Sequence, residues 1–325
     1  MKMLRHLPPV ITLTGLIGLA GCAAGPAIAP LAAPVQSSLM ARTVDLPQLM
    51  GARPSLLPGQ RAIAQRTNPA TPKTPYELWE THQAGRWQTA VRLFADLPSA
   101  YEPQLMAVGA ATHLYFSAIP PRSYIPRVYQ TRAVGRGEWA EPEKLDLLEQ
   151  GRGAETPAVV KAVNGKWWMA YCSAGATPDV RLATGTDGVA WQATDKVADG
   201  RHPAIIALAD GRLVLAYEQG TSVIIRQSVD GTAWQDGVTI PNSKEPALAI
   251  SGKAVLLATV DAGTRRNAGV TWRRSADGRQ WSSPYAVGGT AGFGSVRWLV
   301  EGAKTSLYGA AAGGQGMINF VSVVP

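Results

Sequence analysis

The segment Val223-Ile-Ile-Arg-Gln-Ser-Val-Asp-Gly-Thr-Ala-Trp234 decides the fold of this chain. It predicts a strand, a tight turn and the start of a second strand, because an Asp-Gly pair supplies the positive φ that a hairpin turn needs. Ser228, two residues before Asp230, can bond the backbone of the same turn. We expect the ring of Trp234, which follows the turn, to pack against a neighbouring sheet.

This hairpin recurs along the chain, and a second unit alternates with it. Copies without gaps occupy residues 180–191 and 270–281, and weaker copies occupy 128–139 and 76–87. In the second unit a proline opens an apolar strand, a turn follows, and another apolar strand returns. These units start at Pro103, Pro157, Pro203 and Pro246, and a fifth copy runs over residues 295–309. Each repeat therefore holds four short strands.

Four strands in about 40–50 residues make up one blade of a β-propeller. We predict an all-β chain in which residues 76–325 form a propeller of five blades, each with four antiparallel strands. Six blades is the alternative, if two weak repeats have been merged. Residues 76–93 would supply outer strands to the blade that the C-terminal strands begin. N- and C-terminal strands would thus close one blade and remove an open sheet edge.

The pattern Ser-x-Asp-Gly-x-x-Trp is similar to the Asp box of sialidase-like proteins with BNR repeats, although it is one residue shorter. The stretch Gly165-Lys-Trp-Trp-Met-Ala-Tyr-Cys-Ser173 resembles the five-bladed arabinanase-like and xylosidase-like glycoside hydrolases. These resemblances imply a carbohydrate-active propeller, either glycoside-hydrolase-like or glycan-binding. We interpret Asp187, Asp230 and Asp277 as structural residues that staple their own turns.

Carboxylates begin three of the predicted inner strands, where side chains face the central channel of a propeller. They are Glu102, Glu155 and Glu245, and we predict them as catalytic residues. Glycoside hydrolysis needs one protonated acid and one base or nucleophile, and clustered like charges raise one pKa. The arabinanase-like resemblance places acidic residues directly before proline at these starts. Glu102 and Glu245 match that placement, and Glu155 is one residue off. A solvated polar rim is the alternative interpretation.

Other polar residues at the channel are candidates for substrate binding: His202, Glu218, Asp261, Arg265 and Tyr124. No second histidine stands near His202 in the sequence, so we predict no metal site, and no cofactor is expected. The opposing functional hypothesis is a non-catalytic propeller that serves as a protein-binding scaffold in an envelope complex.

The N-terminus has the features of a signal peptide over residues 1–21. Lys2 and Arg5 precede an apolar run of 11 residues, from 10 to 20, which is too short to span a bilayer. Leu19-Ala-Gly-Cys22 resembles the lipobox of bacterial lipoproteins, which implies a lipid on Cys22 and, with Ala23 next, the outer membrane. A plain secretory peptide is the alternative. Residues 22–75 contain nine prolines and are predicted to be an extended tether.

The composition limits the class of protein and its partners. Charged residues are 17% and apolar residues 46% of the chain, which excludes a disordered acidic or basic chain, a coiled coil and a collagen. Two cysteines exclude a disulfide scaffold, and Cys172 is expected to be a core thiol. The net charge of +8 is spread along the chain. We expect the membrane, through the anchor, and glycans or an envelope protein as partners, and no nucleic acid.

Overall fold

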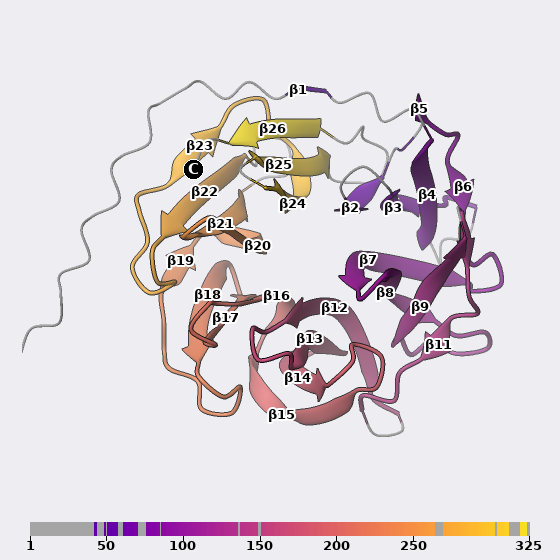
Figure 1. Ribbon diagram of the computed structural model, residues 1–325, viewed down its shortest axis with the longest axis horizontal. Helices are drawn as coiled ribbons and strands as arrows, with labels where there is room; N and C mark the ends of the chain where they lie inside the picture. Colours follow the sequence, from indigo (N-terminus) through magenta and orange to yellow (C-terminus); the bar gives the residue numbers. More distant parts are fainter. Residues whose placement is uncertain are drawn as a thin grey trace, which may run out of the picture. The chain divides into compact units, whose positions relative to one another are not determined.

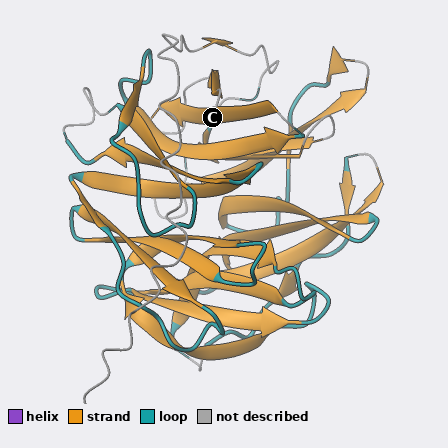
Figure 2. Ribbon diagram, turned by 60° about the vertical axis from the view of Figure 1, so that its left-hand side comes forward, coloured by secondary structure: helices purple, strands orange, loops and turns teal. Residues whose placement is uncertain are grey.

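A computed structural model gives the architecture. It describes residues 42–43, 49, 51–57, 61–70, 76–84, 86–135, 137–148, 151–263, 269–302, 304–311 and 319–323. Strands dominate this part of the chain, as Figure 2 shows. None of the described segments forms a helix long and apolar enough to cross a membrane.

The described strands form six antiparallel sheets, which we call blades one to six. Blade one holds β2 (Ala52–Leu57), β3 (Arg61–Thr67), β4 (Tyr76–Ala84), β5 (Arg86–Trp87) and β6 (Val91–Arg92). Blade two holds β7 (Ser99–Val108), β8 (Ala111–Ile119), β9 (Arg127–Gly135), β10 (Glu138–Trp139) and β11 (Glu143–Lys144). Blade three holds β12 (Gly153–Lys161), β13 (Trp167–Ala174), β14 (Asp179–Gly185) and β15 (Gln192–Asp199).

The remaining blades follow the same order. Blade four holds β16 (Arg201–Ala207), β17 (Leu213–Gln219), β18 (Ser222–Ser228) and β19 (Thr239–Pro241). Blade five holds β20 (Ser243–Ser251), β21 (Ala254–Asp261), β22 (Val270–Ser275) and β23 (Tyr285–Val287). Blade six holds β24 (Phe293–Glu301), β25 (Lys304–Ala311), β26 (Asn319–Val323) and β1 (Arg42–Thr43).

The first strand of each blade faces a central axis, and these inner strands form a closed ring (Figure 1). Each inner strand contacts the inner strand of the next blade, and β24 of blade six contacts β2 of blade one. The prediction of an all-β propeller with four antiparallel strands per blade is therefore confirmed. The five inner strands that we predicted are all present, at β7, β12, β16, β20 and β24.

The sheets number six, which is the alternative count, because an inner strand also forms inside the predicted tether. β2 and β3 lie within residues 22–75, so the boundary at residue 76 has to be corrected. Pro54 was taken as a sign of extended linker, yet it occupies the same place in β2 that Pro103 occupies in β7. A proline is compatible with a strand where the strand bulges, because no ladder hydrogen bond is lost there.

The predicted partner of the C-terminal strands also has to be corrected. β4 holds the first half of the residues 76–93 that were expected to complete the last blade. It pairs instead with β3, from Tyr76 opposite Thr67 to His82 opposite Arg61. In the last blade, the short strand β1 pairs with β26. β3 and β4 are consecutive strands in the chain. Pairing them has a smaller entropic cost of loop closure than pairing β4 with the C-terminal strands would have.

The core lies between adjacent blades, and the repeated tryptophans help to build it. Trp191 of blade three meets Tyr115 of blade two edge to face, with ring centroids 5.9 Å apart. Trp281 of blade five packs against the buried cluster around Val214 of blade four. Each ring thus lies against the preceding blade, as expected, and buries apolar surface that a lone sheet would expose to water.

Blade three shows how one strand serves two cores. Trp167 and Trp168 are adjacent in β13, and the two side chains of such a pair point to opposite faces of a sheet. Both are buried, at 3% and 5% exposure, in the clusters on the two sides of the blade. Cys172 on the same strand is fully buried, in agreement with its predicted role as a core thiol.

The Asp-Gly hairpins are stapled by their own aspartates. Asp230 Oδ1 accepts hydrogen bonds from the backbone N–H groups of Thr232 at 2.8 Å and Ala233 at 3.0 Å. Asp187 and Asp277 accept the corresponding two N–H groups of their own turns. These bonds fit the structural role that the pattern predicted.

We predict that Gly231→Ala destabilises the protein much more than Gly211→Ala. Gly231 has a φ of 79°, and a Cβ there would overlap the Trp168 ring, so strain and overpacking together should lower the free energy of unfolding by about 3 kcal/mol. Gly211 has a φ of 88° with no other atom near its Cβ direction, so its loss should be about 1 kcal/mol. Urea unfolding followed by tryptophan fluorescence measures both, and equal losses would contradict the packing argument.

Candidate functional site

A repeated bulge places one side chain from each of five blades at the central channel. In blade two, Tyr101 pairs with Ser117 and Gln104 pairs with Tyr115, so two residues of β7 stand opposite one residue of β8. The residue that starts each bulge has a positive φ, between 47° and 57°, and the next residue is proline. These residues are Arg53, Glu102, Thr156, His202 and Glu245. Each non-glycine residue in this conformation stores about 1 kcal/mol or more of strain.

Each strained backbone is held by a hydrogen bond from its own N–H group. In four blades the acceptor lies at the end of the second strand of the preceding blade. The four pairs are Glu102 with Gln65, Thr156 with Ser117, His202 with Cys172, and Glu245 with Glu218. In blade one, Arg53 N donates instead to Ser295 Oγ at 3.0 Å. Neighbouring blades therefore position these side chains jointly, which is the kind of support that backbone strain requires.

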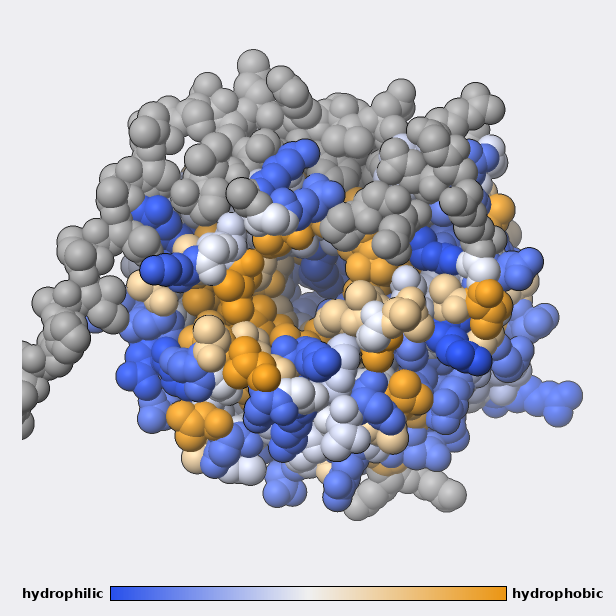
Figure 3. All heavy atoms as spheres, in the orientation of Figure 1, coloured by the Kyte–Doolittle hydropathy of each residue, from blue (hydrophilic) through white to orange (hydrophobic). Residues whose placement is uncertain are grey.

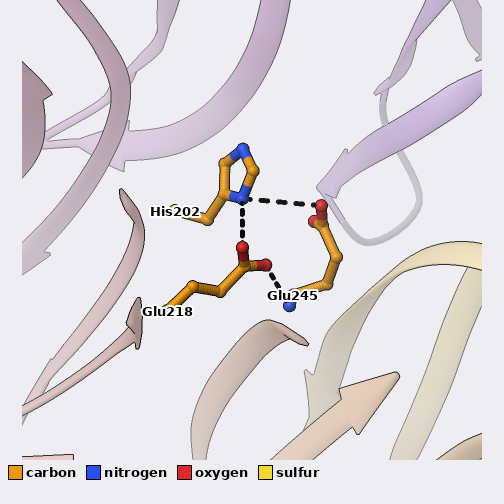
Figure 4. A group of neighbouring side chains, drawn as sticks. All are labelled: His202, Glu218 and Glu245. Carbon is orange, nitrogen blue, oxygen red and sulfur yellow. Dashed lines mark hydrogen bonds and ion pairs between the residues drawn. The ribbon is translucent and has the colours of Figure 1, made fainter. Parts of the chain in front are cut away.

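Arg53 is the centre of a buried charge cluster. Its guanidinium forms ion pairs with Glu102 of blade two and Glu245 of blade five, and its Nη2 atom lies 3.2 Å from Nε2 of His202 in blade four. The other ring nitrogen of His202 lies 3.1 Å from Glu218 Oε2 and 3.7 Å from Glu245 Oε1. We call these five residues the channel cluster. Figure 4 shows that the three residues from blades four and five point toward one another.

Two further arginines lie at the border of the channel cluster. Arg297 of blade six is 3.8 Å from Glu102, and Arg201 is 3.5 Å from Glu218. The side chain of Arg201 is 58% exposed, so water screens its contribution. The three carboxylates are 7–8% exposed and are therefore charges that need partners.

Burial and ion pairing act in opposite directions on these groups. Burial lowers the pKa of Arg53, but the carboxylates of Glu102 and Glu245 outweigh it and raise that pKa above its ordinary value. Burial raises the pKa of Glu102, but Arg53, His202 and Arg297 together outweigh burial and lower that pKa below its ordinary value. Burial and the positive charge of Arg53 both lower the pKa of His202. The carboxylates of Glu245 and Glu218 outweigh them, so the pKa of His202 is raised above its ordinary value.

Glu155 lies in a different environment from the other predicted catalytic residues. The bulge position in blade three belongs to Thr156, and Glu155 instead accepts a hydrogen bond of 2.8 Å from the hydroxyl of Tyr101. Burial raises its pKa above the ordinary value, and the Tyr101 hydroxyl opposes this only in part. No described cation forms an ion pair with Glu155, in contrast to Glu102 and Glu245.

A cavity of about 380 Å³ opens above the channel cluster on the side of blades one to three. Glu102 and Glu155 both line it, together with the rings of Tyr76 and Tyr101, whose centroids are 5.5 Å apart. A second cavity, of about 180 Å³, borders the channel cluster and is lined by apolar side chains such as Leu105 as well as by Arg53 and Glu245. Figure 3 shows the hollow at the centre of the ring of blades, with apolar residues around it. The cavity thus combines aromatic walls with two carboxyl groups.

His202, Glu218 and Glu245 form the group of described residues that could hold a metal ion. One ligand atom from each lies within 4.8 Å of the others. However, Arg53 already binds Glu245 and faces His202, and its positive charge would repel a cation at this point. The chemistry of the group therefore fits an ion-pair network better than a metal site.

The structure brings together four of the predicted site residues and separates others. The channel cluster contains Glu102, Glu245, His202 and Glu218. Asp261 lies apart, and its Oδ1 accepts a hydrogen bond of 2.9 Å from Gly263 N in its own loop. Tyr124 is 83% exposed on the loop after β8. Arg265 and Cys22 lie outside the described residues.

Two arginines of the site, Arg53 and Arg297, were not predicted from the sequence. Arg53 was hidden in the predicted tether, although Arg53-Pro54 before an apolar run repeats the pattern of Glu102-Pro103. That repeat was the signal that could have found it. Arg297 carries no such signal, because only the closed ring brings it near Glu102 of another blade.

Comparisons with known proteins support the fold. No family model and no curated protein matches the chain. A protein of unknown function from Dyadobacter fermentans DSM 18053 superposes with a TM-score of 0.63 at 17% identity, covering 84% of this chain and 94% of that one. The α-L-arabinofuranosidase Arb93A from Fusarium graminearum gives a TM-score of 0.59 at 17% identity, over 85% and 93% of the two chains.

The sialidase of Trypanosoma rangeli gives a TM-score of 0.62 at 12% identity, over 85% of this chain and 54% of that one. The chain is thus structurally similar to glycoside-hydrolase propellers. At these identities the similarity shows the fold alone.

We predict that His202→Gln removes a pH dependence of stability. A pKa raised above 6.5 in the folded state contributes stability that is present below pH 6.5 and lost as the pH rises through the folded value. The free energy of unfolding of the wild type should therefore decrease as the pH rises above 6.5, and this decrease should be absent in the variant. Chemical unfolding at a series of pH values measures it.

The matched control is His113→Gln. The pKa of His113 is lowered by burial, so its stability contribution has the opposite sign and is lost as the pH falls. His113→Gln should therefore still show the decrease in the free energy of unfolding above pH 6.5. An unchanged fall in His202→Gln would show that the imidazole charge does not stabilise the channel cluster.

Proposed function

We propose that the cavity above the channel cluster binds a glycan and hydrolyses a glycosidic bond, with Glu155 as the general acid. The observation that carries this proposal is the contrast between two carboxyl groups in one cavity. Burial raises the pKa of Glu155, while Arg53 lowers the pKa of Glu102. A pair whose environments push the two pKa values apart supplies the protonated acid and the ionised carboxylate that glycoside hydrolysis requires.

The roles follow from this contrast. Glu155 gives its proton to the departing glycosidic oxygen, and Glu102 stays ionised beside the sugar ring, where positive charge develops in the transition state. Tyr101 holds the Glu155 carboxyl in place through its hydroxyl. Glu245, the third predicted catalytic residue, positions Arg53 and His202 instead of lining the cavity. The anomeric configuration of the product would assign Glu102 as nucleophile or as base.

The aromatic walls support a sugar as the ligand. Tyr76 and Tyr101 present flat apolar faces with polar edges, which suit the alternating C–H and hydroxyl faces of a pyranose or furanose. The glycoside hydrolases with similar folds are consistent with this ligand class, although they are at most 17% identical.

We predict that Glu155→Gln lowers kcat by about 10²–10⁴-fold, the range that loss of a general acid produces, with little change in KM. The amide keeps the size of the side chain and can still accept the Tyr101 hydrogen bond, so the fold should be unchanged. A panel of 4-nitrophenyl glycosides and plant and bacterial polysaccharides identifies the substrate. Glu141→Gln, at an exposed position in blade two, is the matched control.

A second candidate function is a non-catalytic propeller that binds an envelope protein. It is favoured by the ion pairs of Arg53, which neutralise two of the three predicted catalytic carboxylates. The same panel separates the two candidates. Binding of a glycan without hydrolysis, or hydrolysis that Glu155→Gln leaves intact, would overturn the assignment of Glu155 as general acid.

We also propose that the chain is exported and anchored to the outer membrane through a lipid on Cys22. The support is the apolar run that ends in Leu19-Ala-Gly-Cys22. Two or more acyl chains bind a bilayer stably, because each buried methylene contributes about 0.8 kcal/mol.

We predict that Cys22→Ser moves the protein from the membrane fraction to the soluble fraction and abolishes metabolic labelling with an alkyne fatty acid. Cys172→Ser is the control, because that thiol is fully buried and should not be labelled. Labelling that persists in Cys22→Ser would contradict the anchor.

A further inference from the structure

We propose that blade three carries a second binding site, for a neutral oligosaccharide, on the hairpin turns between its strands. A groove of about 700 Å³ lies there, between the turn that joins β12 to β13 and the Asp-Gly turn that joins β14 to β15. Asn164, Lys166, Thr184, Trp191 and Gln192 line it. None of these residues lines the channel cavities, so the site is separate from the proposed catalytic one.

The aromatic wall of the groove is held rigidly. Trp191 Nε1 donates to Gln130 Oε1 at 3.2 Å, and its ring meets Tyr115 edge to face. Gln130 is itself 3% exposed and donates through Nε2 to Glu143 at 3.1 Å and to the carbonyl oxygen of Val189 at 2.8 Å. A tryptophan fixed in this way offers a flat platform with little entropy to lose on binding.

The same place in blade four is filled. The repeat aligns Thr184 with Gln227 and Gln192 with Gln235. Arg212 Nη1 donates to Gln227 Oε1 at 2.7 Å, and Arg279 Nη2 donates to Gln235 Oε1 at 3.1 Å. In blade four, arginine side chains thus bind the side-chain amide oxygens of both glutamines. Blade three has the shorter Thr184 at the first position, and the groove is open there.

The polar groups of the groove suit a neutral polyol. Among the described residues, the side chains of Thr184, Thr186 and Gln192 form no hydrogen bond, so their donors and acceptors are available. The one charged residue that lines the groove, Lys166, has its Nζ 4.1 Å from the ring centroid of Trp168, and a cation held over a ring is partly satisfied there. Hydroxyls, an amide and an aromatic face recognise a sugar without a charged group.

The test uses the intact protein and four neutral probes: cellohexaose, xylohexaose, mannohexaose and arabinohexaose. Hexagalacturonic acid serves as the charged comparison. Saturation-transfer NMR detects binding, and calorimetry measures Kd for each variant. At least one neutral probe should bind the wild type. Thr184→Arg, which fills the groove as arginine does in blade four, should weaken this binding by about tenfold or more, equivalent to about 1.4 kcal/mol.

Three further variants keep the result interpretable. Gln192→Ala should weaken binding by about fivefold, the loss of one hydrogen bond, and Gln235→Ala in blade four should leave it unchanged. Glu141→Gln, at the exposed position in blade two, should also leave it unchanged. The assay measures binding and not hydrolysis, so failure of the proposed catalytic site does not affect this test. Matching thermal unfolding curves establish that each variant folds. The proposal would be overturned if only hexagalacturonic acid binds, if no neutral probe binds, or if Thr184→Arg binds as the wild type does.

Discussion

The contacts of the Arg53 guanidinium are the interaction on which the centre of this propeller depends. One side chain from blade one reaches Glu102 in blade two, His202 in blade four and Glu245 in blade five. Removing one partner of a buried ion pair leaves an uncompensated charge, which costs about 3–5 kcal/mol. Arg53 therefore ties blade one to its neighbour blade two and also to blades four and five, which are not its neighbours along the ring.

The repeated bulge explains how a fold built from similar blades acquires an asymmetric site. Each bulge supplies the same strained backbone and aims one side chain at the channel, while the residue type differs from blade to blade. Arg53, Thr156 and Glu245 thus occupy equivalent positions with different chemistry. The hydrogen bond that each bulge N–H donates to the preceding blade makes each position depend on its neighbour, so that the site is complete only in the closed ring.

Local patterns predicted the fold well. The Asp-Gly hairpins are short-range features, since Asp230 bonds groups two and three residues away, and the pattern alone indicates them. The inner strands that start at Pro103 or Pro246 were also predicted correctly. The error came from Pro54, because proline content alone does not separate a linker from a bulged strand. The first two strands of blade one, β2 and β3, were therefore assigned to the tether, and Arg53 of β2 was missed with them.

The candidate site was predicted only in part, because its contacts join residues that are far apart in the chain. Glu102 and Glu245 were identified from their place before proline, but their common partner lies 49 and 192 residues away. The opposite environments of Glu102 and Glu155 depend on which neighbours bury them. The sequence by itself determined the Asp-Gly hairpins, the four-strand repeat and the placement of Glu102 and Glu245 at the channel. Only the tertiary structure decided the number of blades and the opposite environments of Glu102 and Glu155, because both follow from which distant segments the closed ring brings into contact.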